Sequence, residues 1–178
     1  MLFIISCCAF KFTLLISNIS EMNSCFVTLE GFQLGKSLIV KELHLLAEEG
    51  EEHKHFVFLP PTHQLSIDEQ RIVRYSTRYI HGFGWYEGDV PYYAIEGILR
   101  KIQNYTIFSY GYTTCNFLRL LLPATVVIDT QKEGYAMPKV IPTQKCFREH
   151  TPRHCAKAKA HVIRQFVRGC EEEKPRVD

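Results

Sequence analysis

Two short aliphatic runs flank a helical segment in the second half of the chain. Residues 105–110 and 124–129 have the length and the β-branched content of buried strands. The segment between them predicts a helix that begins at Thr113 or Thr114 and ends at Leu122. Because alternating strands and helices build a sheet covered by helices, this unit predicts an α/β domain.

A pair of strands is predicted earlier in the chain. Residues 38–46 form an aliphatic run that polar residues interrupt, which is typical of a buried strand with polar positions near one end. Residues 55–61 predict a second strand that two prolines end. The charged turn between the runs predicts a hairpin. Glu42 is the unusual residue here, because carboxylates are rarely buried without a partner.

Two helices are predicted between these units. Ser66 and Glu69 have the S-x-x-E spacing of a capping box, and a short helix is expected after it. Asp89 is expected to cap a helix that runs to about Gln103, with Pro91 in its first turn. The glycine-rich segment before that helix, residues 81–91, contains the only tryptophan and is expected to be an exposed functional or bracing loop.

A final helix is predicted after Thr151 and Pro152, which have the form of a cap followed by a first-turn proline. The helix has an apolar stripe of Cys155, Val162, Ile163, Phe166, Val167 and Cys170. Its basic face carries Lys157, His161, Arg164 and Arg168, together with Arg153. That face is either an ordinary solvated face or a surface that contacts phosphates.

Length and charge limit the domain organisation and the partners. With 178 residues and 46% apolar residues, the chain is expected to form one domain over residues 26–170, followed by a charged, disordered tail at 171–178. Residues 1–25 form an apolar N-terminal extension, which is either a poor signal or anchor, a packed element, or a segment outside the fold. A net charge of +2 provides no bulk attraction for nucleic acid, so any such affinity must come from local patches.

The seven cysteines are an odd number without the regular spacing of a disulfide scaffold. They predict reduced thiols and an intracellular protein, cytoplasmic or nuclear, with secretion as the minority alternative because of the apolar N-terminus. No membrane association is expected unless that segment is a real anchor. Cys115 would need a setting that lowers its thiol pKa to act as a nucleophile.

Four stretches resemble the DEDDh exonucleases of the ribonuclease H superfamily. They are IVKELHLL with HFVFLPP, YIHGFGWYEGDVPYYAIEGILRKI, IFSYGYTTCNFLRLLLPATVVID, and HTPRHCAKAKAHVIRQF, which together span residues 37–167. The resemblance implies a ribonuclease H-like, DEDDh exonuclease-like mixed sheet flanked by helices.

The acidic residues of that family are mostly replaced. Only Glu42 is present from the D-x-E pair expected on the first strand, with Val40 in the aspartate's place, and the second aspartate aligns with Thr114. His150 is retained from the terminal H-x4-D, but Cys155 replaces its aspartate. Two-metal catalysis needs several carboxylates to hold two cations, so a conventional two-metal exonuclease is not expected.

The replacements resemble the Maelstrom domain, a DEDDh-derived module with a Glu-Cys-His-Cys tetrad. The resemblance implies that Glu42, Cys146, His150 and Cys155 take those four positions. Two thiolates, an imidazole and a carboxylate form a plausible tetrahedral zinc set. Alternatively, Cys155 is a core thiol and His150 caps a helix or faces solvent. The neighbouring His154 is a competing ligand that is expected to lie at the surface.

Aromatic residues around the glycine-rich loop are candidates for base stacking. Trp85 and Tyr86 are the candidates, because aromatic rings beside basic residues can stack on single-stranded bases, although such rings more often serve in packing.

The leading hypothesis is a catalytically degenerate nuclease-fold domain that binds single-stranded RNA or a protein partner, with a structural zinc and no evident small-molecule cofactor. By resemblance to the Maelstrom domain, it implies a role in small-RNA transposon silencing. One alternative is an active single-strand ribonuclease that uses Glu42 and His150 without two-metal catalysis. Another is an interaction module derived from a mobile element or virus.

Overall fold

A mixed sheet organises the part of the chain that the computed structural model describes, residues 23–48, 53–138 and 155–172. Within these residues the strands are β1 (Ser24–Leu34), β2 (Ser37–Ala47), β3 (His53–Val57), β4 (Thr106–Ser109) and β5 (Val127–Asp129). Their spatial order is β3-β2-β1-β4-β5. The pairs β1–β2 and β2–β3 are antiparallel, whereas β1–β4 and β4–β5 are parallel.

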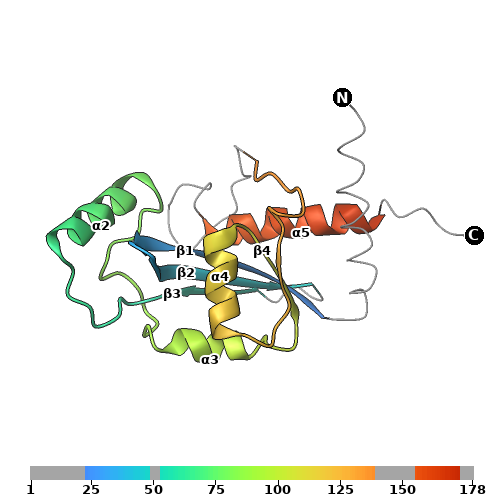
Figure 1. The fold of residues 1–178 in the computed structure, drawn as a ribbon, viewed down its shortest axis with the longest axis horizontal. Coiled ribbons are helices and arrows are strands. Elements are labelled where there is room, and N and C mark those ends of the chain that lie inside the picture. Colours follow the sequence, from blue (N-terminus) through green and yellow to red (C-terminus); the bar gives the residue numbers. More distant parts are fainter. Residues whose placement is uncertain (1–22, 49–52, 139–154, 173–178) are drawn as a thin grey trace, which may run out of the picture.

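Helices cover both faces of this sheet (Figure 1). One face packs against α3 (Ala94–Arg100) and α4 (Tyr112–Leu121), and the opposite face packs against α5 (Ala156–Glu172). A fourth helix among the described residues, α2 (Ile67–Tyr79), packs Val73 against Phe32, Leu34 and Trp85. The predicted α/β class, with a mixed sheet flanked by helices, is confirmed.

The two sheet faces follow from the alternation of side chains along the strands. Cys25, Val27 and Leu29 of β1 belong to the core under α3 and α4. Phe26 belongs to the core under α5, which also contains Phe108, Ile128, Ala160, Ile163 and Val167. Among the described residues, no helix combines the length and the apolar character needed to cross a membrane.

The central strand β1 was not among the predicted elements. The strand predicted at 38–46 is the second strand, and its hairpin with β3 is confirmed. The strand β1 includes Ser24 and Cys25, which had been assigned to the N-terminal extension. The Cα atom of Cys25 is in register with Ala47 on one side and Ile107 on the other, so this boundary was placed too late.

A bulge bends the β1–β2 hairpin at Gly31. The register passes from Glu30 opposite Glu42 to Gly31 opposite Val40, which leaves Lys41 as the additional residue. A Cβ atom at Gly31 would lie 2.1 Å from the carbonyl oxygen of Ile39, so only glycine allows this close approach of the two strands.

The predicted helices exist, but one begins later than expected. Ser66 and Glu69 form the predicted capping box of α2. Asp89 does not cap α3, because its backbone N–H and that of Val90 donate to the carbonyl of Val57, which holds this segment extended beside the end of β3. The helix therefore begins at Ala94. The predicted cap at Thr151 and Pro152 lies outside the described residues.

Candidate functional site

The carboxylate of Glu42 lies at the N-terminal end of α5. Side-chain alternation on β2 directs Glu42 and Leu46 toward the α5 face of the sheet, and Glu42 is fully buried. Its Oε2 atom accepts a hydrogen bond of 2.9 Å from the backbone N–H of Ala156, the first residue of α5. Its Oε1 atom lies 2.7 Å from Nε2 of His55 on β3. A helix N-terminus stabilises a carboxylate, because free N–H groups and the helix dipole both point toward it.

Cys155 lies directly before this helix end. Its side chain is 2% exposed, and its Sγ atom accepts a contact of 3.5 Å from the backbone N–H of Ala158. Since Glu42 bonds to the residue that follows Cys155, the structure brings these two predicted zinc ligands to the same end of α5, although they are far apart in the sequence.

The other two predicted ligands, Cys146 and His150, lie outside the described residues, as does His154. Among residues 23–48, 53–138 and 155–172, no group of three or more histidine, cysteine, aspartate or glutamate side chains is arranged to hold a metal ion. The four-residue zinc set therefore stays a prediction.

Glu30 is a second carboxylate of this region, and the sequence reasoning missed it. It lies opposite Glu42 in the β1–β2 register and forms an ion pair with Lys159 of α5. Burial raises the pKa of Glu30 to about 7, and the Coulombic effect of Lys159 opposes that rise. The alternation of apolar and polar residues along 25–30 was the sequence signal for this position.

Thr28 completes the contact between β1 and the start of α5. Its Oγ1 donates a hydrogen bond of 2.5 Å to the backbone carbonyl of Ala156. Thr28, Glu30 and Glu42 thus all connect the two central strands to the first turn of α5, which makes this helix end a polar, tightly bonded part of the interior.

Four residues of the basic face predicted on α5 lie at least partly at the surface, Lys157, His161, Arg164 and Arg168. Arg168 donates a hydrogen bond of 3.1 Å to the backbone carbonyl of Glu48. Partial burial lowers the pKa of Arg164, and the charge of Arg168 adds to that effect. His161 differs, because its ring lies 6.2 Å from that of His44 on β2 and its Nε2 atom is buried. It faces the sheet, so a direct role in phosphate contact does not follow from its position.

The two predicted stacking residues have opposite environments. Trp85 is 6% exposed and packs against Phe32, with ring centroids 5.5 Å apart. From this position its ring cannot stack on a base, because packing by Phe32 and α2 covers it. Tyr86 is 82% exposed and is the ring that a ligand could reach. The loop 81–91 is therefore partly a bracing element, as one of the two predictions for it had stated.

Cys115 lies on α4 and is buried in the core between this helix and the sheet. Burial raises the pKa of its thiol to about 12, and the negative charge of Asp129 adds to the rise. A thiol with this pKa is protonated at neutral pH, which makes Cys115 unsuitable as a nucleophile.

Comparison with known proteins returned no relative. No protein-family model matches the sequence, and neither a curated protein nor a solved structure shows significant similarity to it. The fold class and the contacts around Glu42 are therefore the observations from which a function can be argued.

Proposed function

We propose that this chain is a catalytically degenerate ribonuclease H-like domain, similar to the DEDDh exonucleases and the Maelstrom domain, that binds single-stranded RNA or a protein partner. The observation that carries the proposal is the hydrogen bond between Glu42 and the first residue of α5, directly beside Cys155. The sheet consists of an antiparallel three-strand unit and two further parallel strands, and α5 lies across one of its faces. This arrangement is compatible with a ribonuclease H-like fold.

The state of the carboxylates supports catalytic degeneracy. Glu42 lies on β2 and not on the first strand of the sheet, where the family's D-x-E pair is expected. On β1, Thr28 and Glu30 have that i, i+2 spacing, with threonine in the aspartate's place. Glu30 is bound by Lys159, and Glu42 is bound by His55 and Ala156. Two-metal catalysis needs several carboxylates to hold two cations, and these two, which also bind protein partners, are too few. Full burial also makes Glu42 unfavourable as a general base for a bound phosphate.

A structural zinc fits the two predicted ligands that the structure describes. Glu42 and Cys155 meet at one helix end, and a carboxylate has enough lone pairs to bind a metal while it keeps the hydrogen bond from Ala156. With Cys146 and His150 the donor set would be two thiolates, an imidazole and a carboxylate, which zinc prefers. Bound zinc would tie β2 to α5 and to the segment before it, and its binding free energy would add to folding stability.

The outer side of α5 supports the binding part of the proposal. Lys157, Arg164 and Arg168 lie on one side of this helix. Cationic side chains at this spacing suit a single-stranded phosphate backbone, and the exposed ring of Tyr86 is available for stacking elsewhere on the domain. By resemblance to the Maelstrom domain, the RNA bound would belong to small-RNA transposon silencing.

The zinc part is tested by elemental mass spectrometry on full-length protein purified without an affinity metal. The expected result is about one zinc per chain in the wild type, and its loss in Cys155→Ser. Cys115→Ser is the matched control, because Cys115 is equally buried but belongs to the opposite face of the sheet. Wild-type protein without zinc, or Cys155→Ser that retains it, would disprove the zinc site.

The RNA part is tested by the salt dependence of binding to a labelled single strand. Replacing Lys157, Arg164 and Arg168 with alanine is expected to reduce the slope of log K against log salt by about 2, since each single-strand phosphate contact contributes about 0.7. The control replaces Arg71, Arg74 and Arg78, three exposed arginines of α2, and should leave the slope unchanged. Equal loss in both variants would mean that α5 is not the binding surface.

A further inference from the structure

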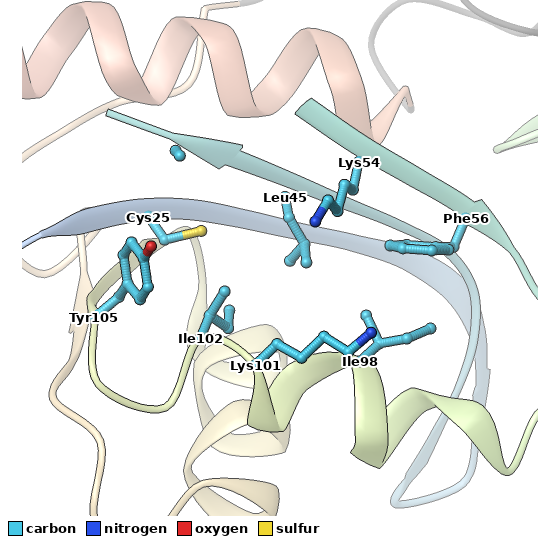
Figure 2. A pocket seen from close by; sticks show the side chains of 9 residues that line it. Cys25, Leu45, Lys54, Phe56, Ile98, Lys101, Ile102 and Tyr105 are labelled. Atoms are coloured by element: carbon cyan, nitrogen blue, oxygen red, sulfur yellow. The ribbon is translucent and has the colours of Figure 1, made fainter. Parts of the chain in front are cut away.

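The helices α2 and α3 differ in where their apolar side chains lie. Ile98 of α3 and Ile102 of the turn after it point toward Leu45 and Phe56 of the sheet (Figure 2). Helix α2 lies at one end of the domain, near the β1–β2 turn, and packs on it through Val73 (Figure 1). The other side of α2 faces outward, and large apolar side chains remain exposed on it.

The outer side of α2 carries two neighbouring rows of exposed residues. The apolar row consists of Ile72, Tyr75 and Tyr79. The basic row consists of Arg71, Arg74 and Arg78. Each row has the i, i+3, i+7 spacing that keeps side chains on one side of a helix. Because the rows are offset by one residue, the basic row borders the apolar row along the helix.

The tyrosines of the apolar row are exposed and already ordered by contacts with their neighbours. Tyr75 and Tyr79 are 59% and 61% exposed, and their ring centroids lie 5.1 Å apart. The guanidinium of Arg78 lies 5.2 Å from the centre of the Tyr79 ring. Side chains that are ordered before binding lose less freedom in a complex. Tyrosine and arginine are also the residues that most often dominate protein–protein interfaces, so this surface suits a protein partner.

The charges of α2 favour an acidic partner. Asp68 pairs with Arg71 at 3.0 Å, and Glu69 is bound to Ser66 in the capping box. The outer side therefore keeps a positive charge along Arg74 and Arg78. A second copy of the chain fits poorly, because two α2 helices paired through their apolar rows would bring arginines close to arginines. Single-stranded RNA fits less well than a helix, since the apolar row includes Ile72, which offers no ring for base stacking.

We propose that the outer side of α2 binds an acidic amphipathic helix of a protein partner. The apolar side chains of that helix pack on Ile72, Tyr75 and Tyr79, and its acidic side chains pair with Arg74 and Arg78. With 13 residues, α2 is about 20 Å long, which offers a partner helix about two heptads of contact. The inference goes beyond the proposed function and does not depend on it, since neither zinc nor RNA takes part.

The test titrates a synthetic peptide into isotope-labelled full-length protein. The peptide has about 21 residues, with Leu at heptad positions a and d and Glu at e and g, so that repulsion between glutamates keeps it from pairing with itself. Saturable NMR shifts are expected at the backbone amides of residues 71–79, and the peptide should gain helical circular dichroism. A peptide with Lys in place of Glu should bind about tenfold more weakly or worse, and one with Ser in place of Leu should not bind.

Variants of exposed residues separate the roles of the two rows. The double variant Tyr75→Ala, Tyr79→Ala should weaken binding of the Glu peptide by about tenfold or more. The double variant Arg74→Glu, Arg78→Glu should reverse the preference, so that the Lys peptide binds more tightly than the Glu peptide. Tyr93→Ala and Lys132→Glu, at exposed positions outside α2, are the matched controls and should change neither affinity.

The inference is overturned if the Glu and Lys peptides bind the wild type equally, or if residues 71–79 show no saturable shift. Two other results overturn it by assigning the surface to another occupant. A wild-type dimer in sedimentation that the tyrosine variant dissociates would assign it to a second copy of the chain. A reduced salt slope of RNA binding after replacement of the three arginines would assign it to RNA. The charge-reversed variant keeps the test decisive even if the tyrosine variant does not fold.

Discussion

Glu42 Oε2 accepts a hydrogen bond of 2.9 Å from the backbone N–H of Ala156, which connects the second strand of the sheet to the first turn of its last helix. The same carboxylate lies within hydrogen-bond distance of His55 on β3. One buried side chain thus joins the β2–β3 hairpin to α5, whose first residue is 114 positions from Glu42 in the sequence. Such a group stabilises a fold only while its partners are present, because each polar atom left without a bond in the interior costs free energy.

Glu42→Ala should therefore lower the free energy of unfolding by about 2–4 kcal/mol, because it leaves the Ala156 N–H and the His55 ring without their acceptor. Urea denaturation followed by circular dichroism measures the change. Glu96→Ala is the control: Glu96 pairs with Arg100 on the exposed side of α3, and its loss should cost less than about 0.5 kcal/mol. A Glu42 variant as stable as this control would show that the contact contributes little.

Lys41 provides a second buried polar connection. Its side chain is fully buried at the bulge of β2, and its Nζ atom donates to the backbone carbonyls of Phe58, Trp85 and Glu87. Lys41→Met removes all three bonds and should lower the unfolding free energy by about 3 kcal/mol or more. Lys36→Met, in the exposed turn of the same hairpin, should have almost no effect. Chemical denaturation of both variants tests the difference, and equal stabilities would contradict it.

Trp85 and Tyr86 are adjacent in sequence and should differ sharply on substitution. Trp85→Ala opens a cavity beside Phe32 and is expected to lower stability by about 3–5 kcal/mol. Tyr86→Ala removes an exposed ring and should change stability by less than about 0.5 kcal/mol. If the domain binds single-stranded RNA through this ring, only Tyr86→Ala should weaken binding while the protein stays folded. A stable, fully folded Trp85→Ala would refute the bracing role of the tryptophan.

Local patterns made the helices and the β2–β3 hairpin predictable. The capping box at Ser66 and the aliphatic runs of β2, β4 and β5 carry their own signals within a few residues. Strand β1 was missed because Thr28 and Glu30 break the continuous apolar run that is typical of a buried central strand, and because Gly31 weakens a strand interior. The fold accommodates these residues through tertiary contacts: Lys159 of α5 pairs with Glu30, and β2 approaches Gly31 closely. Neither contact can be read from the local sequence.

The residues of the candidate site were also only partly predictable from the sequence. Glu42 and Cys155 were identified from residue type and resemblance, and the structure brings them to one helix end. Glu30 was not identified, because its importance depends on the cross-strand register with Glu42. Trp85 was expected at the surface because it lies in a glycine-rich loop. Its side chain is buried by Phe32 and α2, and the spacing of residues in the sequence does not show that these elements lie beside it.

The buried thiols should be chemically inert in the folded protein. Burial raises the pKa of Cys25 and of Cys115 to about 12, and both side chains are almost inaccessible. At pH 8, iodoacetamide should leave both unmodified in native protein and should modify both in urea, as mapped by mass spectrometry. Rapid native labelling of Cys115 would contradict its position in the core.

Glu30 should make the folded protein less stable as the pH rises. Its pKa is about 7 in the folded protein against an ordinary value of 4.5, so the folded state holds this proton more tightly than the unfolded state does. The stabilising contribution is complete below about pH 4.5 and is lost as the pH rises through 7, with a total change of roughly 3 kcal/mol.

The variant Glu30→Gln has no titrating carboxyl at this position, so the unfolding free energy of the wild type minus that of the variant should fall between pH 4.5 and pH 8. Glu69→Gln is a control of opposite sign, because backbone N–H donation from Ser66 lowers the pKa of Glu69. That contribution is present above the ordinary pKa and is lost as the pH falls. Since other groups titrate equally in each pair, the differences isolate the two glutamates. The difference in unfolding free energy between the wild type and Glu30→Gln could instead stay constant with pH. That result would mean that Glu30 has the same pKa in the folded protein as in the unfolded chain.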